Sequence, residues 1–241
     1  MSWRFPIAPG NSKLGALVHS WSLPANEIIC RAATALCASL CYAKRGFFLM
    51  PNVKQGLDEN EELSRSSSFT RVIVAALISL FVRVLRVHAS GEFYDADYVR
   101  KWIKIVRQCP NVTFYAYTRC WQDSELYPLL VELADEPNFL MWWSCDRESG
   151  MPPKDYGIRT AFLMENDDDH PTFDVDLCFR NRKVGKRTKR VMKWAYNGSL
   201  ICPAENDATN ATCSRCKLCF TDRSVPKQKQ LVSIASIANH E

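Results

Sequence analysis

Phe81-Val-Arg-Val-Leu-Arg-Val-His88 is the first of three short apolar stretches, and it is followed by Val112-Thr-Phe-Tyr-Ala-Tyr117 and Phe139-Leu-Met-Trp-Trp-Ser144. Each has the β-branched and aromatic content of a strand. The segments between them, Asp95 to Gln108 and about Ser124 to Ala134, have helical spacing. Strands and helices alternating at this spacing are typical of right-handed βαβ units. The sequence therefore predicts an α/β fold with a parallel sheet.

Further elements are expected on both sides of this unit. A connection at 44–58 should separate two helices upstream, and the sheet should continue downstream. The expected upstream elements are a strand at Ala16 to Ser22 and helices at Ala32 to Ala43 and Glu59 to Leu80. The expected downstream elements are strands at Gly157 to Met164 and Phe173 to Phe179 and a short helix near Arg187 to Trp194.

Composition indicates an ordinary globular protein, with 47% hydrophobic and 24% charged residues in 241. The amino terminus lacks an apolar signal core. The longest apolar run, Val72 to Val82, is shorter than the ~17 to 25 residues that cross a bilayer. We therefore expect a cytoplasmic protein without membrane contact. Residues 1–200 should form the α/β domain, and residues 201–241 a cysteine-rich extension and tail.

Three cysteines, Cys30, Cys37 and Cys41, fall within twelve residues. Three thiols leave one metal coordination position open for a small molecule or a distant residue. They follow the first predicted strand, and so should lie at the carboxyl end of the sheet, where α/β folds place their chemistry. Cys37 and Cys41 would share one face of the predicted helix. The alternative is that all three are small core residues.

A second group consists of Cys202 and the C-x2-C-x2-C run of Cys213, Cys216 and Cys219. This spacing matches loops that wrap a [4Fe-4S] cluster. A four-thiolate zinc site is the alternative. The remaining cysteines are spread singly and are expected to be mostly buried, with Cys120 and Cys145 just past strand ends; they are Cys109, Cys120, Cys145 and Cys178.

Charge is distributed unevenly between residues 165 and 193. An acidic patch is followed by a basic run, which is either a solvated hairpin or a surface for nucleic acid or an acidic partner. The acidic residues are Glu165, Asp167, Asp168, Asp169, Asp174 and Asp176. The basic residues are Arg180, Arg182, Lys183, Lys186, Arg187, Lys189, Arg190 and Lys193.

The order of features resembles the radical S-adenosylmethionine superfamily. An aromatic residue, Tyr42, follows the last cysteine of the triad, and the turns Ser90-Gly91-Glu92-Phe93 and Tyr117-Thr118-Arg119 follow the next two strands. The resemblance implies a partial TIM-type barrel, a [4Fe-4S] cluster with an open iron, S-adenosylmethionine as its ligand, an electron donor and an auxiliary cluster. It implies that Ser90, Gly91, Glu92 and Arg119 bind the small molecule.

A closer resemblance covers Lys13 to Phe220. Its motifs include Lys13-Leu-Gly15, Cys41-Tyr42-Ala43, Val87-His88-Ala89-Ser90-Gly91-Glu92-Phe93 and Cys202-Pro203-Ala204, and they are similar to the phage and plasmid family called gene product 88. This resemblance implies a mobile-element origin and the cytoplasm of a host cell.

Single residues carry weaker signals. His88 is either a hydrogen-bonded core histidine or a ligand. Trp142 and Trp143 should point to opposite faces of the sheet, one into the core and one beside the site. Walker, Rossmann, H-E-x-x-H and G-x-S-x-G patterns are absent from the sequence. We assign no catalytic residue.

Together these observations predict an iron-sulfur protein of phage or plasmid type. It would carry one or two [4Fe-4S] clusters and, if it is an enzyme, would carry out radical chemistry. The alternative is a non-enzymatic zinc or iron-sulfur module that binds nucleic acid through residues 180–193. A third option is one shared structural metal site built from both cysteine groups.

Overall fold

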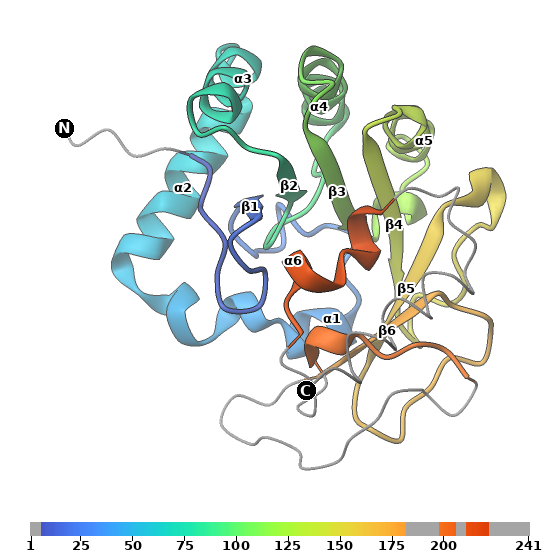
Figure 1. The fold of residues 1–241 in the computed structure, drawn as a ribbon. Helices are drawn as coiled ribbons and strands as arrows, with labels where there is room; N and C mark the ends of the chain where they lie inside the picture. The colour runs from blue at the N-terminus through green and yellow to red at the C-terminus, as the bar shows by residue number, and fades with distance from the viewer. Residues whose placement is uncertain (1–5, 182–197, 206–210, 222–241) are drawn as a thin grey trace.

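A six-stranded sheet forms the centre of the computed structural model, which describes residues 6–181, 198–205 and 211–221. All neighbouring strands are parallel and lie in chain order. The sheet curls into half a barrel (Figure 1), so the predicted α/β fold with a partial barrel of parallel strands is confirmed. The strands are β1 (Val18–Trp21), β2 (Val84–Val87), β3 (Thr113–Thr118), β4 (Phe139–Cys145), β5 (Arg159–Met164) and β6 (Leu177–Arg180).

Helices between the strands cover the outer side of the sheet (Figure 1). None of those in the described ranges is long and apolar enough to cross a membrane. The α-helices are α1 (Ala35–Leu40), α2 (Pro51–Arg65), α3 (Phe69–Ser79), α4 (Ala96–Gln108), α5 (Tyr127–Asp135) and α6 (Cys213–Cys216). The 3₁₀ turns are η1 (Tyr42–Lys44), η2 (Gly46–Leu49), η3 (Cys120–Gln122), η4 (Asp155–Gly157), η5 (Pro203–Glu205) and η6 (Leu218–Phe220).

Helix α4 forms where its sequence pattern predicts it. The Asp95 side chain accepts a hydrogen bond of 2.7 Å from the Tyr98 backbone N–H and so caps the first turn. The predicted apolar stripe, which includes Trp102 and Ile105, is buried against the sheet. Capping and amphipathicity agree here, which explains the close match between prediction and structure.

Two helix predictions are wrong in their extent. The single helix expected from Glu59 to Leu80 is two helices, because the chain turns at residues 66–68. There the Ser66 hydroxyl donates to the Leu63 carbonyl at 2.8 Å, a local bond that competes with helix propagation. The first of the two helices begins at Pro51, so half of the connection expected at 44–58 is helical. The helix expected at Ala32 to Ala43 ends at Leu40. Cys41 has non-helical dihedrals (φ −57°, ψ 116°), so it does not share a helix face with Cys37.

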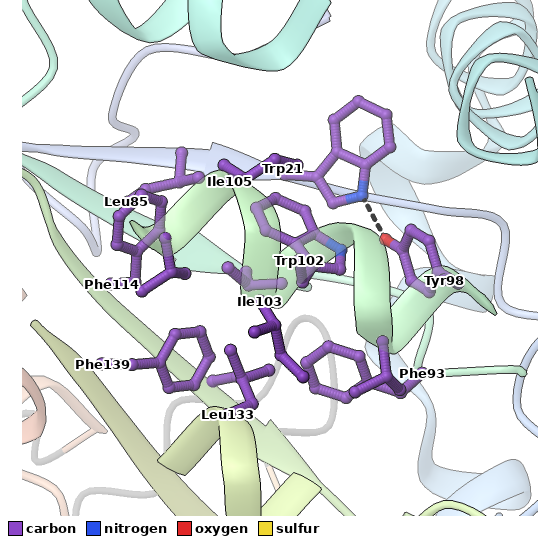
Figure 2. Packing of buried hydrophobic residues seen from close by; sticks show 14 of the residues in the cluster. Trp21, Leu85, Phe93, Tyr98, Trp102, Ile103, Ile105, Phe114, Leu133 and Phe139 are labelled. Atoms are coloured by element: carbon purple, nitrogen blue, oxygen red, sulfur yellow. Dashed lines mark hydrogen bonds between the residues drawn. The ribbon is translucent and has the colours of Figure 1, made fainter. Parts of the chain in front are cut away.

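The outer face of the sheet and helices α3 to α5 enclose the main hydrophobic core (Figure 2). The Trp21 indole N–H donates a 2.8 Å hydrogen bond to the Tyr98 hydroxyl. Nε2 of His88 lies 2.9 Å from the same oxygen. Burial, and then the nearby Arg86, lower the pKa of His88 to about 3, so this imidazole is neutral. His88 is therefore a hydrogen-bonded core histidine, as one of the two expectations had it.

The inner face of the sheet is covered by the carboxy-terminal segment. Val84, Tyr115 and Leu140 pack there against Cys213, Cys219 and Phe220 in one apolar cluster. A second inner cluster joins Leu177 to Cys202 and Leu218. Figure 1 shows α6 on the concave side of the sheet, opposite the outer helices.

The two adjacent tryptophans of β4 separate as the strand alternation predicts. Trp143 packs in the outer core, whereas Trp142 packs with the inner cluster that contains Cys202. Both side chains are fully buried. The predicted placement on opposite faces is confirmed.

The Tyr98 hydroxyl gives a test of the outer core. Tyr98→Phe leaves the buried Trp21 N–H without its acceptor, and we expect a loss of about 1 to 3 kcal/mol in the free energy of unfolding. Urea denaturation measures it. Tyr156→Phe, at a side chain that is 60% exposed, is the control. Equal stability of the two variants would contradict this account.

Candidate metal centres

The carboxy-terminal cysteine group is held by the loop that precedes β1. The Cys213 N–H donates to the Lys13 carbonyl and the Ser214 N–H to the Leu14 carbonyl, each at 2.9 Å. The Ser214 hydroxyl also donates to Leu14 O at 2.8 Å and accepts from Leu17 N–H at 3.1 Å. Gly15 has φ +76°, and a Cβ there would lie 2.6 Å from the Ser214 hydroxyl oxygen. A glycine is therefore needed for this close approach.

A short helix and a left-handed turn bring the last three cysteines to the inner face. Thr212 caps α6, and Lys217 ends it with φ +59° before η6 begins. Arg159 on β5 then donates to the carbonyls of Leu218 at 2.9 Å and Thr221 at 3.2 Å. The Trp142 indole N–H donates to Cys219 O at 3.0 Å. The sheet thus fixes the backbone on both sides of the C-x2-C-x2-C run.

Cys202 reaches the same place from another segment. Its N–H donates to the Cys178 carbonyl at 2.9 Å, so residues 200–202 run beside β6. All four cysteine residues of the group line one small cavity, together with apolar residues that include Leu177 and Leu218. Burial raises the pKa of every one of these thiols, and that of Cys219 reaches about 12. Without a metal they are neutral thiols; binding a cation would release their protons.

The amino-terminal triad is anchored to the end of β4. Thr34 caps α1 by accepting from Cys37 N–H at 3.0 Å, and its hydroxyl donates to the Asp146 carboxylate at 2.6 Å. The Leu36 N–H donates to Glu148 at 2.9 Å. The triad therefore lies at the carboxyl ends of the strands, where its sequence position predicts it.

The triad cysteines are partly exposed, as are three of the four cysteines of the other group, Cys213, Cys216 and Cys219. Burial raises the pKa of Cys30 to about 12, and the charges of Glu92, Cys41 and Cys37 contribute further. Tyr42, next to Cys41, donates its hydroxyl to the Ala89 carbonyl just after β2. The aromatic residue thus ties the triad to the neighbouring strand.

The predicted small-molecule residues Ser90 and Gly91 are packed against the end of β1. The Ser90 hydroxyl donates to Leu23 O at 2.8 Å, and Leu23 N–H donates to Ser90 O at 2.9 Å. Gly91 has φ +85°, and a Cβ there would lie 2.5 Å from the Leu23 Cβ. These contacts give both residues a structural role in joining β1 to β2.

Glu92 and Arg119 lie at the same edge and are both buried. The Glu92 carboxylate accepts from the backbone N–H groups of Phe93 and Arg119, each at 2.9 Å. Burial raises the pKa of Glu92, while these N–H groups oppose the shift. The Arg119 guanidinium pairs with Asp146 at 3.1 Å. The carboxyl ends of β2, β3 and β4 are thereby joined by charged and polar contacts.

Neither predicted cysteine group is assembled into a metal site in the described part of the chain. Within residues 6–181, 198–205 and 211–221, no three His, Cys, Asp or Glu side chains are placed to hold one metal ion. The basic residues 182–193 and the predicted helix near Arg187 lie outside the described residues. Arg180 is described, and its guanidinium pairs with Asp167 at 2.7 Å. The singly spread cysteines are buried, as expected.

Sequence reasoning missed several residues around the two groups. Lys13 pairs with Glu205 at 2.5 Å beside Cys202, and Arg86 lies on the inner face near Cys213. An arginine inside an apolar strand is unusual, and this feature of the sequence could have drawn attention to Arg86. No sequence feature marks Asp146, since its role depends on the distant Thr34.

Comparison with known proteins identifies the family. The model of the family described as "Gene product 88" matches residues 7–222. The chain belongs to the gene product 88 family. The matched range includes both cysteine groups. The predicted phage resemblance is thereby confirmed.

Two phage members of the gene product 88 family illustrate the similarity. The "Gene 88 protein" of Mycobacterium phage L5 is 28% identical over 232 residues, which cover 89% of this chain and 87% of that protein. The "Gene 88 protein" of Mycobacterium phage D29 is 26% identical over 233 residues, with the same two coverages of 89% and 87%. No solved structure gives a significant match.

Gly15→Ala should loosen the carboxy-terminal cysteine group, because the new methyl group would collide with Ser214. We expect faster labelling of Cys213 and Cys216 by a thiol reagent in the metal-free protein. Gly46→Ala is the matched control: Gly46 also has a positive φ, +55°, but a Cβ added there would meet nothing within 4 Å. Equal labelling rates would show that the Gly15 contact does not hold the segment.

Asp146→Asn tests the anchor of the triad. Burial would raise the pKa of Asp146, but the Thr34 hydroxyl, backbone N–H groups and Arg119 together hold it below 3.8. The ionised Asp146 carboxylate therefore contributes to the free energy of unfolding above the ordinary Asp pKa, and this contribution is lost as pH falls through the lowered pKa. At neutral pH we expect about 1 to 3 kcal/mol less stability in urea unfolding.

The difference in the free energy of unfolding between wild type and Asp146→Asn should become smaller in acid. The exposed Asp174→Asn serves as the control and should show little difference at any pH. A difference for Asp146→Asn that stays constant down to pH values below 3.8 would argue against the charged form as the stabilising species.

Proposed function

We propose that this gene product 88 protein is an iron-sulfur protein whose fully ligated cluster is held by Cys202, Cys213, Cys216 and Cys219. The observation that carries the proposal is that these four cysteine residues, which come from two separate segments, line one common cavity. Four thiolates are the ligand set of a [4Fe-4S] cluster, and the C-x2-C-x2-C spacing is typical of such a loop. The fit is one of donor type and number, and the side chains would have to turn toward one another on binding.

We extend the proposal to the amino-terminal triad. Cys30, Cys37 and Cys41 supply three thiols at the carboxyl edge of the sheet, a number that leaves one iron of a cluster open. Their place at the edge of the sheet suits a site that a small molecule reaches, whereas the second group packs against the inner face. The electron donor would approach from the solvent side.

A radical enzyme is the finer form of this proposal. A reduced cluster with an open iron can supply one electron to S-adenosylmethionine. The protein's own contribution would be to hold the triad through Thr34 and Asp146 and to shape the edge through Glu92 and Arg119. These polar groups already bond within the protein, so they support the site rather than provide a free ligand-binding surface.

Metal and acid-labile sulfide analysis of anaerobically purified protein tests the proposal. About eight irons with equal sulfide are expected for two clusters, and about four for one. Replacing Cys213, Cys216 and Cys219 by Ala, or separately Cys30, Cys37 and Cys41 by Ala, should each remove one cluster. Cys109→Ala, at an isolated buried cysteine, is the control and should retain all the iron.

The same measurement separates the alternatives. Zinc without sulfide would contradict an iron-sulfur protein and leave a structural zinc site. Iron lost completely in both triple variants would indicate one shared centre. Cleavage of S-adenosylmethionine by the reduced protein tests whether the protein is a radical enzyme. Intact clusters without cleavage would restrict the function to cluster binding.

A further inference from the structure

Arg86 is a positive charge on the inner face of the sheet that lacks a carboxylate partner among the described residues. It lies on β2 in register with Tyr115 of β3. Its guanidinium stands over the Tyr117 ring, 5.6 Å from the centroid. Nε is enclosed and has no hydrogen-bond partner within the described part of the chain. Arg86 also takes no part in any ion pair found within the described ranges.

The surroundings of Arg86 explain why this charge is unusual. The next polar atom on the same face, the Tyr115 hydroxyl, is likewise buried and without a partner in the described ranges. Tyr115 belongs to the apolar cluster that contains Cys213 and Cys219. Arg86 as a whole is half-buried, and burying a cation costs free energy unless an anion lies close to it. The neighbouring phenols and thiols are neutral at physiological pH unless a metal deprotonates the thiols.

Nearby charges do not supply the missing anion. Lys13, another cation of this region, is already paired with Glu205. Arg86 keeps its charge at physiological pH, because a guanidinium is not deprotonated in proteins.

We infer that Arg86 is the counter-charge of a negatively charged metal-thiolate centre at Cys202, Cys213, Cys216 and Cys219. Four thiolates around a divalent metal, or around an oxidised [4Fe-4S] cluster, leave a net charge of about −2. No carboxylate in the described part of the chain neutralises the Arg86 guanidinium. Its positive charge therefore stabilises this excess negative charge across the inner face. Arg86 is thus a positioning residue for the centre and not one of its ligands. This inference rests on the proposed carboxy-terminal centre.

Zinc titration in a triad-free background, with Cys30, Cys37 and Cys41 replaced by Ala, isolates the carboxy-terminal centre. Competition with a chromophoric chelator gives the affinity for Zn²⁺, which serves as the probe metal. Arg86→Met should weaken Zn²⁺ binding by about 10- to 100-fold, the effect typical of residues that support metal ligands. Arg86→Lys, which keeps the charge, should recover most of the affinity. Arg83→Met, at an exposed arginine just before β2, should leave it unchanged.

Thermal unfolding of the metal-free variants distinguishes this role from a structural one. Loss of an unbalanced charge should leave metal-free Arg86→Met as stable as the parent, or more stable, while its zinc-loaded form loses stability. In iron-loaded protein the same substitution should shift the reduction potential to more negative values. Unchanged Zn²⁺ affinity in Arg86→Met would overturn the inference while the centre itself stands. Absence of Zn²⁺ and iron binding in the parent protein would overturn the carboxy-terminal centre and the inference with it.

Discussion

A curled parallel sheet has two faces, and both must be covered if the strands are to stay out of water. The outer face of this half-barrel is covered by the crossover helices and their aromatic core. The inner face lies on the concave side of the sheet, and the chain fills it with residues from its carboxy-terminal segment. Because that segment carries four cysteines, covering the sheet also packs them against its inner face.

The two cysteine groups therefore occupy different environments. The carboxy-terminal group is fixed by backbone hydrogen bonds to the loop at Leu14 and by Arg159 of β5. The amino-terminal group sits at the open edge, where Asp146 joins α1 to the end of β4. An enclosed group suits a permanent centre, whereas an edge group suits a site that exchanges a ligand or an electron. This contrast is the physical basis for assigning them different proposed roles.

Strands and the best helices could be predicted because local pattern and tertiary packing agree. Asp95 caps α4 and the apolar stripe of that helix is buried, so the local sequence alone was sufficient. The break at Ser66 depended on a side-chain bond to the backbone, which competes with helix formation only in context. The early end of α1 removed the shared helix face expected for Cys37 and Cys41.

The candidate sites were less predictable than the fold. Spacing identified the cysteines, since two-residue gaps have few other uses. Spacing could not show that residues 211–221 fill the inside of the sheet, because that depends on contacts between distant parts of the chain, such as Ser214 with Leu14. The same limit concealed Arg86, whose neighbours are defined only once β2 and β3 lie side by side.

Iron X-ray absorption on the triad-free protein, purified anaerobically, reports on the carboxy-terminal centre alone, because only the carboxy-terminal cysteines then remain as a group. An iron-sulfur cluster at Cys202, Cys213, Cys216 and Cys219 should give a first shell made of sulfur alone, together with iron-iron scattering, and both should be lost in the additional Cys202→Ser variant. A spectrum dominated by oxygen or nitrogen ligands, or a protein that retains no iron, would contradict it.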